Sequence, residues 1–394
     1  MSIDLTAMQD DLVQLRRQLH RVPEVGLDLP RTRDLVLGAL DGLPLELSTG
    51  RSSTSVTAVL RGGRPGPVVL LRGDMDALPL TEDTGLEFAS ATPGVMHACG
   101  HDSHVAMLVG AAKLLCARRE TLAGTVQFMF QPGEEGHDGA LRMIEEGILD
   151  AAGRRADASY ALHVISGMLP AGLFASRPGQ MMAASGVLKV TVRGAGGHGS
   201  TPHRAKDPIP AACAMVTALQ TFVTRRFDVF DPVVLTVGSF HAGNAHNVIP
   251  DDAVFEATMR SFSGAAQIRL LEESVRVVRG IATAHGVEVD VIAEELFPLT
   301  VNDVSRVAGV ADVVRERFGA ERYLDLPNPL TGSEDFSRVL DAVPGAMVFL
   351  GATAAGADPA TAPYNHSPLA AFDDRVLCDG ATLYAELALQ HLSG

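Results

Sequence analysis

Pro67-Val-Val-Leu-Leu-Arg72 runs directly into Gly73-Asp-Met-Asp-Ala-Leu-Pro79. The first six residues form a short apolar run of the kind that is buried in a sheet. Two aspartates follow the expected end of this strand, and α/β sheets place their chemistry at the carboxyl ends of their strands. Acidic loops after strands also serve solubility alone, so this pair indicates a site only in company with other signals.

Two later strands are expected to end in the same way. The predicted strand 124–130 is followed by Gln131-Pro-Gly-Glu-Glu135, and the predicted strand 158–164 carries His163 near its end. Adjacent carboxylates can divide labour, one binding a metal and the other moving protons on a metal-bound water. An acidic pair at a helix N-terminus, favoured by the helix dipole, is the plainer alternative. A lone histidine at a strand end is more often a core residue, but this is the third strand end in a row with a ligand-type group.

His97-Ala-Cys-Gly-His-Asp-Ser-His104 is the densest group of metal-binding side chains in the sequence. Thiolate sulfur and imidazole nitrogen suit borderline and softer divalent metals, and Gly100 lets Cys99 and His101 converge. A structural zinc site, a Cys nucleophile with a His base, and a half-buried cysteine beside surface histidines are the competing interpretations. The first normally shows a second closely spaced Cys or His pair, and the second normally draws its partners from distant parts of the sequence. We interpret the cluster as part of a metal site whose other ligands come from elsewhere in the chain.

The composition sets outer limits on function. With 394 residues the chain is long enough for two domains. Lys and Arg number 32 against 47 Asp and Glu, a net charge of −15, which argues against a nucleic-acid or anionic-membrane partner. The four cysteines show no disulfide framework, the N-terminal segment does not resemble a secretory signal, and no apolar run approaches the length of a membrane span. We therefore expect a cytoplasmic protein.

A separate domain is predicted in the middle of the chain. Its elements follow the order strand, helix, strand, strand, helix, strand, which is ferredoxin-like. Asp207-Pro208 supplies the cap and the first residue of its first helix. We place this inserted domain at residues 185–292 and a discontinuous catalytic domain at 1–184 and 293–394. The expected bounds of the inserted elements are 187–192, 208–223, 233–240, 253–261, 265–285 and 287–291.

The flanking segments alternate helices with apolar strands, which favours an α/β fold for the catalytic domain. Helices are expected up to about residue 43, at 103–117, at about 302–318 and at the C-terminus. Strands are expected at 54–60, 67–72, 124–130, 158–164 and 346–350.

Seven motifs follow one another along the chain: Gly73-Asp-Met-Asp-Ala-Leu-Pro79, His97-Ala-Cys-Gly-His-Asp102, Gln131-Pro-Gly-Glu-Glu135, Gly196-Gly-His-Gly-Ser-Thr-Pro-His203, Asn247-Val-Ile-Pro250, Gly332-Ser-Glu-Asp-Phe336 and Asn365-His-Ser-Pro368. Together and in register, they resemble those of the M20 metallopeptidases. Within that family the chain is similar to the amidohydrolase subfamily of hippurate hydrolases, auxin–amino-acid conjugate hydrolases and related N-acyl-amino-acid amidohydrolases. The resemblance implies an α/β fold with a mixed-sheet, di-metal catalytic domain and an inserted ferredoxin-like lid and dimerisation domain, and hence a homodimer.

The same resemblance implies roles for individual residues. Glu134 falls on the catalytic acid/base, and Asp76 falls on an aspartate that orients a metal-ligating group. Asp74 stands where other branches have a ligating histidine, and we leave it outside the ligand set. The implied cofactors are two divalent ions per subunit, drawn from Mn²⁺, Zn²⁺, Ni²⁺ and Co²⁺. Their implied ligands are Cys99, His101, Glu135, His163 and His366.

Substrate contacts are implied within the insert and after it. His198 matches a lid histidine that stabilises the reacting carbonyl, in many relatives across a dimer interface. Asn247 and Arg260 match groups that recognise the carboxylate of the substrate, and Gly332 and Ser333 match further substrate-binding positions. The planar guanidinium fork suits a carboxylate. From the residues alone, Arg260 would be interpreted as an ordinary surface charge at a strand end.

The predicted function is metal-dependent hydrolysis of the amide bond of N-acyl-amino acids, such as hippurate and N-acetyl or indole-acetyl conjugates, with Glu134 as general acid/base to a metal-activated water. One alternative is an exopeptidase or dipeptidase on the same site, distinguished by a requirement for a free α-amino group. A second is a non-catalytic binder of acyl-amino acids or metal, against which the intact Glu134 argues. Five other histidines are interpreted as structural or as partners of the ligands: His104, His137, His203, His241 and His246.

Overall fold

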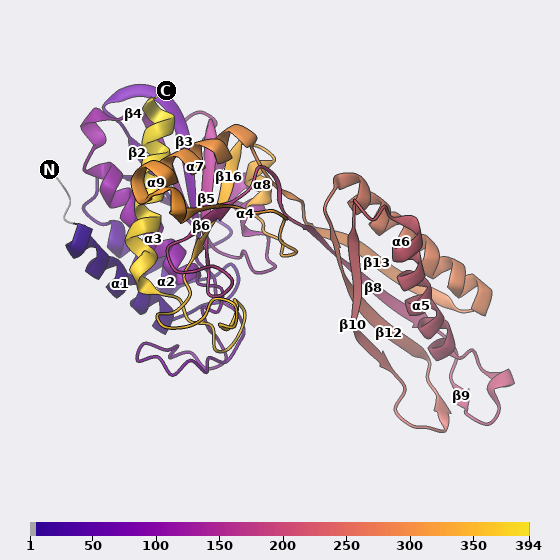
Figure 1. Ribbon diagram of the computed structural model, residues 1–394. Helices are drawn as coiled ribbons and strands as arrows, with labels where there is room; N and C mark the ends of the chain where they lie inside the picture. The colour runs from indigo at the N-terminus through magenta and orange to yellow at the C-terminus, as the bar shows by residue number, and fades with distance from the viewer. Residues whose placement is uncertain (1–4, 394) are drawn as a thin grey trace. The chain divides into compact units, whose positions relative to one another are not determined.

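The computed structural model describes residues 5–393, and the chain divides into two compact units. The second unit comprises residues 182–300 and 329–334, and the rest of the described residues form the first (Figure 1). The limits of the long inserted segment lie three and eight residues from the predicted limits, 185 and 292. The segment 329–334, which the sequence placed with the catalytic domain, belongs to the second unit.

An eight-stranded sheet forms the middle of the first unit. Its strands are β1 (Glu46–Thr49), β2 (Val56–Arg61), β3 (Arg64–Asp74), β4 (Ala123–Gln131), β5 (Ala158–Ile165), β6 (Phe174–Ser176), β15 (Tyr323–Asp325) and β16 (Gly345–Gly351). Their order is β1-β2-β4-β3-β5-β16-β6-β15. The four central strands β4, β3, β5 and β16 are parallel, whereas β2 and β6 join them antiparallel. The predicted mixed sheet is therefore confirmed.

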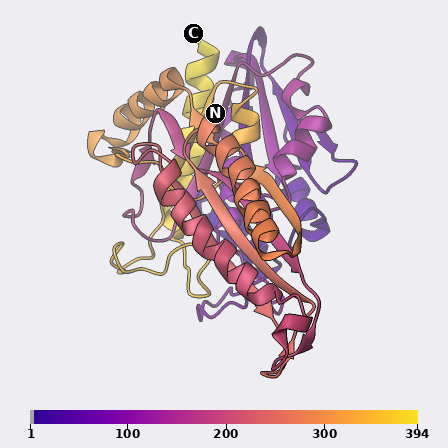
Figure 2. The ribbon, with the colours of Figure 1, turned by 90° about the vertical axis from the view of Figure 1, so that its right-hand side faces the viewer.

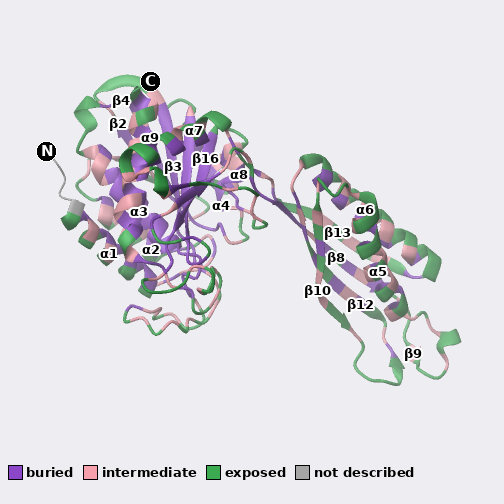
Figure 3. Ribbon diagram, in the orientation of Figure 1, coloured by how far each residue is buried: buried purple, intermediate pink, exposed green. Residues whose placement is uncertain are grey.

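Helices α3 and α9 pack against each other and against β3 and β5, and α1 contacts both helices. α3 is buried along most of its length, which matches its apolar sequence (Figure 3). The first four residues of the predicted N-terminal helical segment lie outside the described residues. The helices of this unit are α1 (Leu5–Arg21), α2 (Pro30–Leu40), α3 (His101–Cys116), α4 (Gly139–Glu145), α7 (Val304–Phe318), α8 (Ser337–Leu340) and α9 (Leu377–Ser393).

The start of α3 depends on one glycine. Gly100 adopts a left-handed backbone with φ of +82°, and a Cβ atom there would lie 2.4 Å from Cγ2 of Val164. Both facts require glycine, because any other residue is strained at positive φ and its Cβ atom would overlap the side chain of Val164. Cys99 and His101 lie directly before and after this glycine, at the end of α3 that faces β5.

A buried tyrosine links α9 to two central strands. The hydroxyl of Tyr384 donates to the carbonyl of Arg72 at 2.5 Å and accepts from the amide of Leu162 at 2.7 Å. In Tyr384→Phe these two buried backbone groups lose that partner, so we expect the free energy of unfolding to fall by about 2 kcal/mol. Urea denaturation measures it, with Tyr323→Phe as the control, because the Tyr323 hydroxyl makes no hydrogen bond to a backbone group of the described residues. Equal stability of the two variants would contradict the expectation.

The second unit has the predicted ferredoxin-like order. Its elements are β8 (Ala184–Arg193), α5 (Pro208–Arg226), β10 (Val233–Ala242), β12 (Asp252–Ser261), α6 (Gly264–His285) and β13 (Glu288–Phe297). The sheet order is β10-β12-β8-β13 with every pair antiparallel, and α5 and α6 lie side by side on one face (Figure 2). The carboxylate of Asp207 accepts from the amide of Ile209 at 3.0 Å, which confirms the predicted cap of α5.

Four short strands complete the two units: β7 (Gly179–Met182), β9 (Gly197–His198), β11 (Val248–Ile249) and β14 (Thr300–Asn302). β9 pairs with β11, and β7 pairs with β14 where the chain passes between the units. Among residues 5–393, none of the helices combines the length and apolarity that a bilayer span requires.

Candidate metal centre

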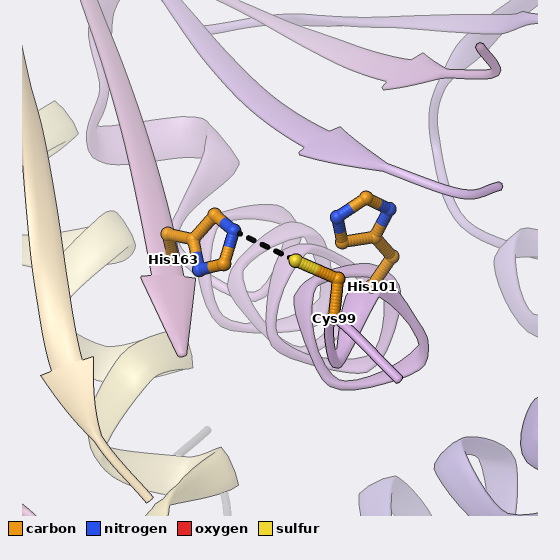
Figure 4. Close-up of side chains that lie close together, drawn as sticks. All are labelled: Cys99, His101 and His163. Atoms are coloured by element: carbon orange, nitrogen blue, oxygen red, sulfur yellow. Dashed lines mark hydrogen bonds between the residues drawn. The ribbon is translucent and has the colours of Figure 1, made fainter. Parts of the chain in front are cut away.

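The five predicted ligands converge within the first unit. The Sγ atom of Cys99 lies 3.4 Å from Nε2 of His163 and 3.3 Å from Nε2 of His366. The Oε1 atom of Glu135 lies 3.1 Å from Nε2 of His366 and 4.0 Å from Nε2 of His101. Figure 4 shows the Cys99 sulfur between the imidazoles of His163 and His101. Four separate parts of the chain therefore bring soft, borderline and hard donor atoms to one place.

The donor atoms fall into overlapping groups of three. Cys99, His101 and His163 form one group whose ligand atoms all lie within 4.8 Å of one another. Cys99, Glu135 and His366 form a second group on the same measure, so the thiol belongs to both. Each group has a size suited to a single ion, and one side chain is common to the two.

Hydrogen bonds set the tautomers of two histidines. His163 donates from Nδ1 to the carbonyl of Val164 at 2.8 Å, which leaves the Nε2 lone pair facing Cys99. His101 likewise donates from Nδ1 to the carbonyl of Asp76 at 2.9 Å. Its Nε2 is buried and has no hydrogen-bond partner among residues 5–393. A metal ligand needs this combination, in which one ring nitrogen is anchored and the other is available.

The carboxylate of Asp76 orients the two glutamates that follow β4. Its Oδ1 accepts from the amide of Glu134 at 3.0 Å, and its Oδ2 accepts from the amide of Glu135 at 2.9 Å. Glu134 is buried, and its carboxylate belongs to a further group of possible donor atoms with His101 and Glu135, all within 4.8 Å. Asp76 thus orients the turn at Glu134 and Glu135 through its side-chain carboxylate, and it orients His101 through its backbone carbonyl.

His366 occupies a strained backbone position. Its φ is +71°, which is uncommon for a residue other than glycine and is typical of functional sites. Its amide donates to the carbonyl of Ala98 at 2.9 Å, and the neighbouring Asn365 donates to the carbonyl of Cys99 at 3.2 Å. Contacts with the side chains of Cys99 and Glu135 raise the pKa of His366 to about 10. The cluster therefore favours positive charge at this point.

Asp74 lies beside the centre with both oxygens engaged. Its Oδ2 is 2.5 Å from Nη1 of Arg72 and 3.5 Å from Nε2 of His101, and its Oδ1 contacts Nδ1 of His104. Burial would raise the pKa of Asp74, but the charges of Arg72 and the two histidines outweigh it and hold that pKa well below its usual range. The guanidinium of Arg72 is itself fully buried and also contacts Asp335 at 3.0 Å.

Sequence reasoning missed Arg72 and Asp335. The signal for Arg72 was present, because an arginine that ends the apolar run 67–71 and precedes an aspartate has to be paired when the strand is buried. Asp335 lies within the motif 332–336, but the sequence assigned it no role; its carboxylate accepts from the side chain of Gln131 at 2.7 Å and from the amide of Ala140 at 2.9 Å.

The remaining predicted residues lie in the second unit. His198 and Asn247 are exposed, and Nδ1 of His198 contacts the hydroxyl of Ser200 at 2.7 Å. Arg260 donates from Nε to the carbonyl of Thr331 at 3.2 Å, next to Gly332 and Ser333. The structure therefore brings Arg260 to the segment 329–334 within this unit.

The guanidinium of Arg260 is held by polar partners that carry no charge. Its Nη1 donates to the hydroxyl of Thr258 at 2.7 Å and to the carbonyl of Met259 at 2.9 Å. Burial lowers the pKa of Arg260 from its usual value.

Most of the sequence matches a known protein family. Residues 70–390 match the model of Peptidase family M20/M25/M40. The chain belongs to this M20 family. The match spans the two units and contains all five predicted ligands.

Full-length relatives agree with this assignment. The M20 chain is 37% identical to Thermostable carboxypeptidase 1 of Saccharolobus solfataricus (98% of this chain, 97% of the relative). It is 38% identical to IAA-amino acid hydrolase ILR1-like 4 of Arabidopsis thaliana (97% and 86%) and 35% identical to the Hippurate hydrolase of Campylobacter jejuni (99% and 98%). A solved structure of the Bacillus subtilis YXEP protein, titled a dinuclear metal-binding peptidase of the M20 family, is 31% identical with a TM-score of 0.82 and covers 98% of this chain and 99% of its own.

The residues of this M20 chain fit divalent metals. Thiolate, imidazole and carboxylate are the donors of borderline divalent ions. The buried Nε2 of His101 makes no hydrogen bond within the described part of the chain, and carboxylate oxygens of Asp74 and Glu135 lie 3.5 and 4.0 Å from it, so a divalent ion bound there would meet anionic donors. Burial, together with the nearby His104, lowers the pKa of His163 well below its usual range and keeps this imidazole in the neutral form that ligates.

Proposed function

We propose that this M20 chain hydrolyses the amide bond of N-acyl-amino acids and releases a carboxylic acid and a free amino acid. The observation that carries the proposal is the buried Glu134 beside the donor atoms of His101 and Glu135. A binding protein would need no such base. The relatives named for hippurate and IAA-amino acid hydrolysis support the substrate class.

The proposed cofactors are two divalent ions, held by Cys99, His101, Glu135, His163 and His366, and the dinuclear relative supports their number. When bound, such ions supply an acidified water and polarise the amide carbonyl. Glu134 takes the proton of the attacking water and delivers it to the leaving nitrogen, and Asp76 holds Glu134 in place through its amide. Mn²⁺, Zn²⁺, Ni²⁺ and Co²⁺ are the candidate ions.

The test is a substrate panel read by chromatography of the products. We expect release of glycine from N-benzoylglycine and turnover of N-acetyl and indole-acetyl amino acids. Free dipeptides that carry an α-amino group should be poor substrates. Strong preference for the free dipeptides would move the assignment to an exopeptidase.

The carboxypeptidase relative supports a different exopeptidase, one that requires a free terminal carboxylate rather than a free α-amino group. Exopeptidase action would use the same donor cluster and the same glutamate on a peptide bond. An N-blocked dipeptide separates the two candidates further. A carboxypeptidase cleaves it at the terminal residue with the efficiency of an N-acyl-amino acid or better, whereas an enzyme selective for small acyl groups does not.

Substrate contacts in the second unit stay predictions: they concern His198, Asn247, Arg260, Gly332 and Ser333. If the Arg260 guanidinium binds the substrate carboxylate, Arg260→Gln raises KM by about 10- to 100-fold, the value of a hydrogen bond to a charged group. Steady-state kinetics on N-benzoylglycine measures it. Arg193→Gln is the control, since Arg193 is exposed and paired with Asp290. A KM within twofold of the wild type in Arg260→Gln would remove this residue from the substrate site.

The homodimer is also a proposal, based on the antiparallel sheet of the second unit, whose outer strands β10 and β13 each leave one edge to pair. We expect light scattering of the purified protein to give the mass of two chains. The mass of a single chain, 41.5 kDa, would contradict it. The cytoplasmic location stays a prediction as well.

A further inference from the structure

His104 uses both of its ring nitrogens, although it is neither exposed nor one of the proposed ligands. Its Nε2 accepts the amide proton of Val164 at 2.8 Å, and its Nδ1 contacts Oδ1 of Asp74. An amide can only donate, so Nε2 is unprotonated and Nδ1 carries the hydrogen. The imidazole is thereby fixed in one tautomer between a carboxylate and the backbone of β5.

Val164 passes this contact on to two parts of the metal centre. Its carbonyl accepts from Nδ1 of His163 at 2.8 Å and from the side-chain amide of Asn365 at 3.0 Å. Asn365 directly precedes His366. Val164, whose N–H donates to His104, thus fixes the tautomer of the proposed ligand His163 and anchors the turn that presents the proposed ligand His366.

The other end of the contact is equally constrained. Arg72 and Asp74 are both fully buried, with Nη1 of Arg72 and Oδ2 of Asp74 2.5 Å apart. The carboxylate that accepts the hydrogen bond from His104 is therefore held in one orientation. The rings of His104 and His163 also pack edge to face with centroids 4.7 Å apart.

We propose that Arg72, Asp74 and His104 act as a positioning relay that sets, through Val164, the orientation of His163 and of the 365–366 turn. The relay rests on the proposed metal centre. It requires that none of its three members bind the metal. A third metal site at Asp74, His101 and His104, whose donor atoms also lie within 4.8 Å, is not favoured, because both His104 nitrogens and both Asp74 oxygens already have protein partners.

Two substitutions separate the two contacts of His104. The amide nitrogen of asparagine can replace Nδ1 as donor to Asp74, so His104→Asn leaves the N–H of Val164 without its acceptor. The longer side chain of glutamine reaches the Nε2 position, so His104→Gln restores an acceptor for Val164. The matched control is His285→Asn, on an exposed residue of α6.

The readout is Co²⁺ binding to metal-stripped full-length protein, followed by chelator competition and by the visible and thiolate-to-cobalt absorption bands. We expect His104→Asn to bind Co²⁺ about 10- to 100-fold more weakly, with altered bands, because partners of metal ligands usually contribute that much to affinity. His104→Gln should recover part of the affinity, because it restores the acceptor for Val164 but not the donor to Asp74, and the remaining loss measures the Arg72–Asp74 end of the relay. His285→Asn should match the wild type.

Wild-type affinity and bands in a folded His104→Asn would overturn the relay. Equal loss in His104→Asn and His104→Gln, accompanied by an equal fall in thermal stability, would also overturn it, because it would assign His104 a merely structural role. A wild-type protein that binds no divalent metal would overturn the metal centre together with the relay. Co²⁺ binding without amide hydrolysis would contradict only the proposed activity.

Discussion

Glu134→Gln should lower kcat for N-benzoylglycine by about 100- to 10,000-fold, the usual contribution of a general acid/base. The amide of glutamine keeps the size of the side chain but cannot take up a proton. The amide–carboxylate contact from residue 134 to Asp76 is made by the backbone and survives the substitution. We therefore expect the metal content, measured by plasma emission spectrometry, and the KM to stay near the wild-type values.

Glu145→Gln is the matched control for this effect. Glu145 lies exposed at the end of α4, a short distance further along the same segment, and its substitution should leave kcat unchanged. A Glu134→Gln enzyme with more than a tenth of the wild-type kcat would show that the proton transfer uses another group. Loss of metal together with activity would instead make Glu134 a ligand.

Cys99→Ala should weaken divalent metal binding by more than about 100-fold, since even the outer partners of ligands contribute 10- to 100-fold. The Cys99 sulfur belongs to both groups of donor atoms, with His163 at 3.4 Å and His366 at 3.3 Å. Its removal therefore weakens both groups at once, and hydrolysis should fall below detection at metal concentrations that saturate the wild type.

Cys213→Ala provides the comparison for this variant. Cys213 is an exposed free thiol on α5 in the second unit, so its loss should change neither metal content nor activity. Isothermal titration with Zn²⁺ and Mn²⁺ measures both variants. Unchanged affinity in Cys99→Ala would remove the thiol from the ligand set and leave the histidines and Glu135 as the candidate ligands.

The sequence predicted the elements whose pattern is strong. The apolar run 67–71 and the capped helix at Asp207 lie within three residues of the observed bounds of β3 and α5, and the β-α-β-β-α-β order is confirmed, although its last strand β13 ends six residues beyond the predicted limit of 291. The short strands β1, β6 and β15 were missed, because three or four residues carry too little periodicity to identify a strand. β1 is exposed throughout, so it also lacks an apolar signal.

The candidate site was predictable where chemistry follows a strand end or a tight turn, as for Asp76, Glu135 and His163. What could not be predicted is how distant segments meet. The contact from Arg72 to Asp335 joins residues 263 positions apart, and the return of 329–334 to the second unit depends on packing that no local pattern records. The role of Val164 between His104 and Asn365 is likewise visible only once the fold is known.

The most direct measurement of the central claim is hydrolysis of N-benzoylglycine by one preparation of the protein in three states: as purified, metal-stripped, and reloaded with Mn²⁺ or Zn²⁺. We expect glycine release that disappears on stripping and returns with metal. The reloaded protein should contain two ions per chain. Undiminished turnover by protein shown to be free of metal, or no turnover with any of the ions, would contradict it.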